Sequence, residues 1–198
     1  ILFEYASSRS SIGDHAAALR ELIEKLPVGV DGKGPRIDFV AHSMGNIVIR
    51  RAIGDWQRGP DPSQALSRLG RMVMLGPPNQ GATIAKKLAK TGIFGVVTGK
   101  GGIELGSEWN ELERTLATPP FPFAVVAGNL EANRFQNPLV EGASDFVVGV
   151  EEAKLQGMSD FVEVPVLHSF LMDDPSVQQS VVRFLETGKL RVPPNEAP

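Results

Sequence analysis

A serine, an aspartate and a histidine in this chain have the types and the order that nucleophilic catalysis requires. Ser43 stands within Ala41-His42-Ser43-Met44-Gly45, and Asp145 and then His168 follow much later in the chain. A serine hydroxyl is a poor nucleophile at neutral pH, so it needs an imidazole to take its proton and a carboxylate to orient that imidazole. The three residues therefore predict a Ser-His-Asp triad.

The sequence around Ser43 predicts a strand that turns sharply into a helix, a nucleophile elbow. Residues 36–40 suit a buried parallel strand, and residues 47–53 suit a helix with apolar residues on nearly every side. Ala41 and Gly45 are small, as a turn that exposes a strained serine requires. In a simpler interpretation, Ser43 only caps the helix.

The chain has three histidines, and one of them must be the base if the triad exists. His42 is expected to be a packed residue, because its side chain points away from its neighbour Ser43. His15 lies at the start of a surface helix and is expected to be solvated. His168 follows the last predicted strand and precedes the apolar residues 169–172, which can shield an imidazole. We therefore predict that His168 is the base.

Asp145 is the predicted acid, because it follows the long connection after the penultimate strand. Asp160 begins a strand and so lies at the opposite end of the sheet. Asp173-Asp174 are better explained as a helix cap and a first-turn charge. Glu151-Glu152 remain weaker alternatives that would otherwise form an exposed charged turn.

Strands and helices alternate along the chain. We predict strands at residues 1–5, 37–40, 72–75, 123–127 and 160–166, and helices at 17–26, 47–53 (ended by Gly54), 61–69, 82–90, 109–116 and 174–187. The glycine-rich segment 92–106 is expected to be either a mobile cover or a plain surface loop. No hairpin signal is present, so we predict a three-layer α/β fold with a mostly parallel sheet. In such sheets functional residues collect at the carboxyl ends of the strands.

Composition narrows the class of protein. The length of 198 residues suits one compact domain, residues 1–190, followed by a flexible proline-rich tail, residues 191–198. A net charge of −3 without a Lys/Arg cluster argues against a nucleic-acid partner. No apolar run is long enough for a transmembrane segment. Because cysteine is absent and the histidines are scattered, we predict neither a metal nor another cofactor.

The chain begins with isoleucine, and residues 1–5 already have the pattern of a strand. We therefore expect that a further segment precedes it in the intact protein. This leaves the location open, cytoplasmic or exported.

Four segments of the chain resemble the bacterial lipase and esterase branch of the α/β-hydrolase superfamily, particularly small lipases with alanine at the first position of the elbow. They are Val40–Gly45, Met74–Gly81, Ser144–Val148 and Val164–Phe170. The resemblance implies that Ser43 attacks an ester carbonyl, that His168 acts as base and then acid, and that Asp145 orients His168. It also implies that the backbone N–H of Met44 contributes to an oxyanion hole.

The chain departs from the family's pattern in one respect. The second oxyanion donor normally comes from a loop after an earlier strand, and no such segment precedes Ile1. If the first strands are absent, a sheet edge is exposed that a second copy or a partner could cover. Candidates for an acyl-binding surface are Phe170 and Leu171, together with Met44, Phe121, Phe123 and Leu167. An ordinary place in the core explains each of these residues at least as well.

Three functions are compatible with these residues. The first is a cofactor-independent serine hydrolase that cleaves carboxylic esters of small molecules or lipids through an acyl-enzyme. The second is an acyltransferase or thioesterase with the same triad. The third is a truncated, non-catalytic hydrolase-like protein that only binds a ligand or partner.

Overall fold

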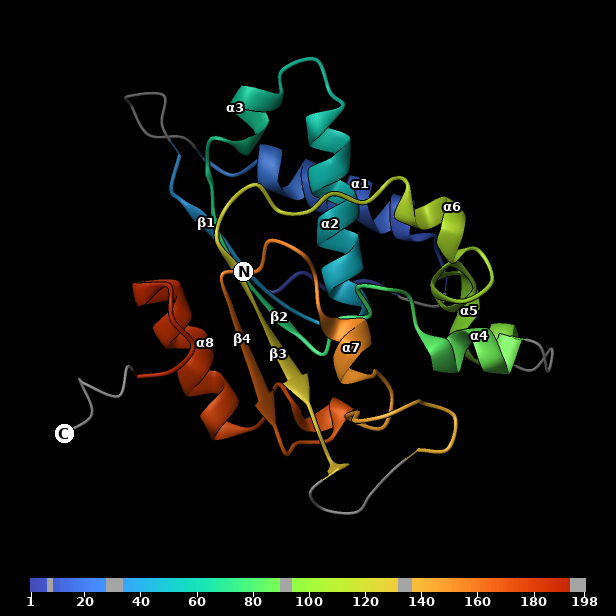
Figure 1. The fold of residues 1–198 in the computed structure, drawn as a ribbon. Helices are drawn as coiled ribbons and strands as arrows, with labels where there is room; N and C mark the ends of the chain where they lie inside the picture. The colour runs from blue at the N-terminus through green and yellow to red at the C-terminus, as the bar shows by residue number, and fades with distance from the viewer. Residues whose placement is uncertain (7–8, 28–33, 90–93, 132–136, 193–198) are drawn as a thin grey trace.

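The centre of the molecule is a four-stranded sheet in which every neighbouring pair is parallel. The computed structural model describes residues 1–6, 9–27, 34–89, 94–131 and 137–192. The strands follow one another across the sheet in chain order: β1 (Ile37–His42), β2 (Leu69–Leu75), β3 (Phe123–Gly128) and β4 (Asp160–Val164). Their carboxyl ends therefore lie at the same end of the sheet (Figure 1). This confirms the predicted α/β fold.

Helices occupy both faces of this sheet. The amino-terminal helix is α1 (Ile12–Glu24), and α8 (Pro175–Thr187) is the last. The helices between them are α2 (Met44–Gln57), α3 (Pro62–Leu66), α4 (Thr83–Ala89), α5 (Phe94–Leu105), α6 (Trp109–Glu113), α7 (Val150–Ala153) and the 3-10 helix η2 (His168–Phe170). In Figure 1, α8 lies apart from α1 and α2, on the other side of the strands.

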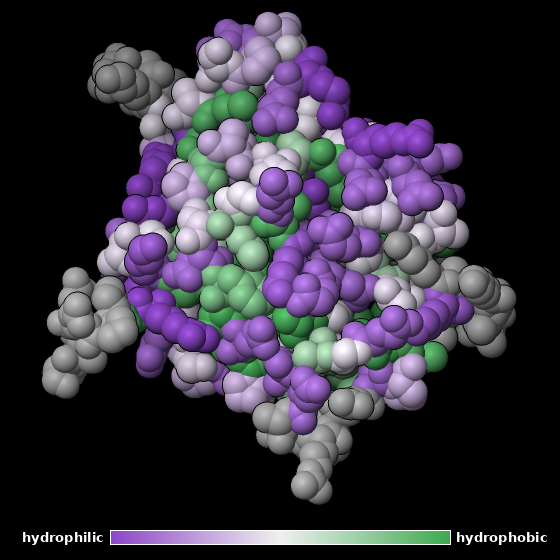
Figure 2. Space-filling view, viewed as in Figure 1, coloured by the Kyte–Doolittle hydropathy of each residue, from purple (hydrophilic) through white to green (hydrophobic). Residues whose placement is uncertain are grey.

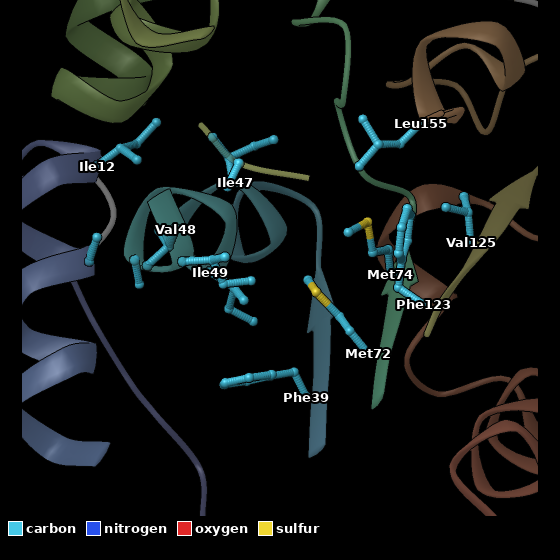
Figure 3. Packing of buried hydrophobic residues seen from close by; sticks show 14 of the residues in the cluster. Ile12, Phe39, Ile47, Val48, Ile49, Met72, Met74, Phe123, Val125 and Leu155 are labelled. Atoms are coloured by element: carbon cyan, nitrogen blue, oxygen red, sulfur yellow. The ribbon is translucent and has the colours of Figure 1, made fainter. Parts of the chain in front are cut away.

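Side chains that alternate along the strands build two cores. The larger core joins the sheet to α1 and α2, and in Figure 3 Phe39 and Met72 point from their strands toward the side on which α2 lies. The smaller core lies under α8 and includes Val73, Val126, Leu171, Val177 and Phe184. Because both faces are covered, the central strands are apolar almost throughout, as parallel strands usually are.

The prediction of a strand at residues 1–5 is wrong. Residues 1–6 form neither a helix nor a strand, and no strand in the described part of the chain pairs with them. Phe3 and Tyr5 instead pack against the larger core, and the Tyr5 ring centroid lies 4.5 Å from that of His15. His15 is therefore buried rather than solvated. A strand needs a neighbour for its backbone hydrogen bonds, so α1 does not follow a strand here.

Two glycine-containing segments are helical where the sequence suggests a break. α2 continues past Gly54, where a Cβ atom would lie 2.4 Å from the carbonyl oxygen of Thr115, so glycine permits a close approach rather than a helix end. Residues 94–105, expected to be a cover or loop, form helix α5, and residues 90–93 lie outside the described part.

The carboxyl-terminal elements agree with the sequence. β4 is an outermost strand, and Pro165 follows it, as an edge position allows. α8 begins with Asp174 as cap and Pro175 at its first position, and it ends at Gly188 with a φ of 79°. Residues 193–198 of the expected tail lie outside the described part.

Polar side chains dominate the rim of the face in Figure 2. No described helix is both long and apolar enough to cross a bilayer.

Candidate active site

Ser43 occupies the turn between β1 and α2 with a φ of 53° and a ψ of −127°. A positive φ strains a residue that carries a Cβ atom, and it persists only where the surroundings hold it. Here the Ser43 N–H donates to the Leu75 carbonyl (2.9 Å), and the Asn46 amide donates to the Ser43 carbonyl (3.0 Å). The Ser43 hydroxyl makes no capping bond to α2, which argues against the simple cap.

The Ser43 hydroxyl instead meets His168. Its Oγ lies 2.9 Å from His168 Nε2, and His168 Nδ1 lies 2.7 Å from Asp145 Oδ2. The His168 and Asp145 side chains are buried. If Nδ1–H donates to the carboxylate, Nε2 is free to accept the serine proton. The structure thus brings the three sequence-predicted residues into one triad-like arrangement.

Asp145 lies near the end of the long connection between β3 and α7. Its second carboxylate oxygen, Oδ1, accepts the backbone N–H groups of Val147 (3.0 Å) and Val148 (2.7 Å). The His168 N–H also donates to the Asp145 carbonyl at 3.0 Å. The backbone of one loop therefore fixes both the carboxylate and the segment that carries the imidazole.

The other candidate acids are engaged elsewhere. Glu152 accepts from the N–H groups of Gly149 and Thr83, and exposed Glu151 pairs with Lys154. Asp174 caps α8, and Asp160 accepts the Leu190 N–H at the amino end of β4. In the described part of the chain, no group of three His, Cys, Asp or Glu side chains could hold a metal ion.

Two glycines that the sequence analysis did not assign to the site make room for the triad. At Gly76, which follows β2 with a φ of 50°, a Cβ atom would lie 3.0 Å from both Asp145 Oδ2 and His168 Nδ1. At Gly128, the last residue of β3, a Cβ atom would lie 2.4 Å from the Asp145 Cβ. The sequence signal that could have identified them is a glycine at the carboxyl end of each of the two central strands, β2 and β3.

The loop from Gly76 to Gly81 is held by buried polar contacts. Arg50 donates from Nη1 to the Asn79 carbonyl (3.2 Å) and to its Oδ1 (3.1 Å), and from Nε to the Ala117 carbonyl (3.0 Å). The Asn79 amide donates in turn to the Ala153 carbonyl (2.8 Å). Burial lowers the pKa of Arg50 to about 10, so the guanidinium stays charged at neutral pH.

The predicted oxyanion donor and the predicted acyl-binding residues do not all lie at the site. Met44 is the first residue of α2, so its N–H has no acceptor within the helix, and none is found among the described residues. Phe170 is exposed beside His168, whereas Leu171 is fully buried under α8. Phe123 belongs to the larger core and Phe121 packs against it, at the amino end of β3, so for these two residues the core interpretation holds and the acyl site does not.

No protein-family model matches the chain, and neither does any curated protein sequence. Solved structures do match. The chain is similar to phospholipase PlaB of Legionella pneumophila, with a TM-score of 0.65 and 17% identity over 96% of this chain and 50% of that one. It is also similar to the mature lipase BlEst2 of Bacillus licheniformis, with a TM-score of 0.60 and 18% identity over 91% of this chain and 74% of that one. A third similar structure is that of the metagenomic carboxyl esterase MGS0156. Its TM-score is 0.61, with 16% identity over 83% of this chain and 53% of that one.

At these identities the similarity establishes the α/β-hydrolase fold. The chain spans about half of the length of PlaB and of MGS0156, and about three quarters of mature BlEst2.

Proposed function

We propose that the chain is a serine hydrolase that cleaves carboxylic esters through an acyl-enzyme, as an esterase or lipase does. The observation that carries the proposal is the continuous hydrogen-bonded line from Ser43 Oγ through the His168 ring to Asp145 Oδ2. The strained backbone of Ser43 and the fold shared with lipases and esterases support it.

In the first half of the proposed reaction, Ser43 Oγ attacks the ester carbonyl carbon while His168 Nε2 takes the hydroxyl proton. The negative oxygen of the tetrahedral intermediate accepts the free N–H of Met44, at the positive end of α2. The intermediate collapses when His168 returns its proton to the departing alcohol. Water then attacks the acyl-enzyme with His168 as base, which releases the acid and restores Ser43.

The apolar part of the substrate is proposed to lie against Phe170. This side chain, with Phe146 and Leu167, lines a groove of about 480 Å³ beside the loops that carry Asp145 and His168. The second predicted contact, Leu171, is buried and offers no surface. An apolar groove beside these two loops suits the acyl chain of an ester more than a charged group.

Hydrolysis of p-nitrophenyl acetate tests the proposal. We expect Ser43→Ala to lower turnover about a million-fold, and His168→Ala to lower it about as much, because the members of a triad act as a unit. Phe170→Ser should raise KM for longer acyl chains with little change for acetate. Wild-type turnover in either triad variant, with both variants folded, would disprove the assignment.

A further inference from the structure

His42 is a partly buried polar side chain at the site that the proposed reaction does not use. It is the last residue of β1 and immediately precedes Ser43. Its ring centroid lies 4.6 Å from that of His168, at an interplanar angle of 45°. Its Nε2 lies 2.9 Å from the backbone carbonyl oxygen of His168. His42 thus contacts the predicted base through both ring and backbone.

The chemistry of this contact fixes the proton on His42. A carbonyl oxygen only accepts, so Nε2 must carry the hydrogen and donate it. Burial, and then the neighbouring His168, hold the pKa of His42 below its ordinary value, although the hydrogen bond and Asp145 oppose this shift. His42 is therefore neutral at neutral pH, with its proton on Nε2. His168 needs the opposite tautomer, with the proton on Nδ1.

The sheet topology explains why such a bond matters. β1 and β4 lie at opposite edges of the sheet, about 14 Å apart across three strand spacings. The segment after β4 must cross the carboxyl ends of β3 and β2 before His168 reaches Ser43. The Asp145 carbonyl anchors this segment on the β3 side, and His42 anchors it on the β1 side.

We propose that His42 is a positioning residue, which ties the His168 segment to the strand of the nucleophile and so keeps His168 Nε2 at 2.9 Å from Ser43 Oγ. The inference rests on the proposed function of Ser43 and His168. The hydrogen bond of His42 goes to the backbone of His168 and not to Ser43 Oγ or His168 Nε2. It sets the distance and angle of proton transfer, and a displacement of about 1 Å at such a point lowers rates by about 100-fold.

Two substitutions separate the hydrogen bond from the bulk of the ring. His42→Gln can place an amide nitrogen near the position of Nε2 and keeps a donor, whereas His42→Phe keeps an aromatic ring and removes the donor. With p-nitrophenyl acetate, we expect His42→Phe to lower kcat about 10- to 100-fold with KM nearly unchanged. His42→Gln should stay within about fivefold of the wild type. His15→Gln, at a buried histidine on α1, is the matched control and should leave kcat unchanged.

Two results would overturn the inference: wild-type kcat in folded His42→Phe, or an equal loss in His42→Phe and His42→Gln. A ¹⁵N spectrum of the histidine rings tests the contact without any substrate and without a variant that must fold. We expect a protonated Nε2 and a bare Nδ1 at His42, and the reverse at His168. A protonated Nδ1 at His42 would also refute the inference. Absence of wild-type esterase activity would instead count against the proposed function, and the ring spectrum would still decide whether His42 holds the His168 segment.

Discussion

Gly76 lies where the Asp145 and His168 side chains meet, so the residue at this position decides whether the pair can form. A Cβ atom there would lie 3.0 Å from both hydrogen-bonding atoms and 2.9 Å from Leu171 Cδ1. These contacts are too tight for all three neighbours to keep their places.

We expect Gly76→Ala to lower kcat for p-nitrophenyl acetate about 10- to 100-fold, because the new methyl group separates Asp145 from His168. Gly142→Ala is the matched control. Gly142 has a similar positive φ of 73°, but nothing lies within 4 Å of its Cβ position. Both variants should lose about 1 kcal/mol of stability from the strained backbone. Equal kcat in the two variants would contradict this role for Gly76.

At the residue scale, the sequence predicted the residues that have distinctive chemistry. Ser43, Asp145 and His168 could be selected because few residues of their types follow predicted strands. The surroundings were not predictable, because Gly76, Gly128 and His42 contribute through distances to residues far away in the chain. Only the packed sheet determines such distances.

At the element scale, the termini of α8 show how local signals set a helix. The Asp174 carboxylate accepts the N–H groups of Ser176 (2.9 Å) and Val177 (3.1 Å), which would otherwise lack acceptors. Hydrogen bonds, first from the Ser176 hydroxyl and then from the Val177 backbone, hold the pKa of Asp174 below its ordinary value.

We expect Asp174→Ala to lower the free energy of unfolding by about 1 kcal/mol at pH 7, as measured in urea. A carboxyl group with a lowered pKa in the fold stabilises above its unfolded pKa of about 4, and this contribution disappears as the pH falls through the folded value. The difference from the wild type should therefore shrink below about pH 4. Asp173→Ala, one residue earlier, is the control. A difference that does not depend on pH would contradict the cap.

Elements with strong local signals were predicted well, and elements that depend on distant partners were not. β2 and β3 are runs of apolar residues, and α8 has a capping residue at its start and a glycine at its end. All three elements form about where expected. Residues 1–5 have strand-like composition but no neighbouring strand. Helix α5 contains several glycines, which have a low helix propensity. Its helical conformation therefore depends on tertiary contacts, which the local sequence does not reveal.

At the scale of the whole molecule, the outer edge of β1 is unpaired among the described strands. Half-exposed Val40 lies in the middle of β1, and an apolar groove of about 580 Å³ runs between this strand and residues 1–5. An open apolar edge favours pairing with another chain. The sequence analysis predicts that a second copy or a partner could cover such an edge, and the second copy is the alternative that can be tested with this chain alone.

Light scattering should then show a dimer whose population grows with concentration. Val40→Lys should shift the protein to the monomer, because a charged side chain opposes edge pairing. Val182→Lys, at a similarly exposed valine on α8, should leave the dimer intact. A monomer at every concentration in the wild type would contradict self-association through β1.

The central claim is that Ser43, His168 and Asp145 form a working triad, and covalent labelling with a fluorophosphonate tests it most directly. The adduct is measured by intact mass and located by peptide mapping, with Ser43→Ala and His168→Ala beside the wild type. We predict one adduct, on Ser43, that is absent from Ser43→Ala and forms far more slowly in His168→Ala. An unmodified wild-type protein, or an adduct on another residue, would contradict the account.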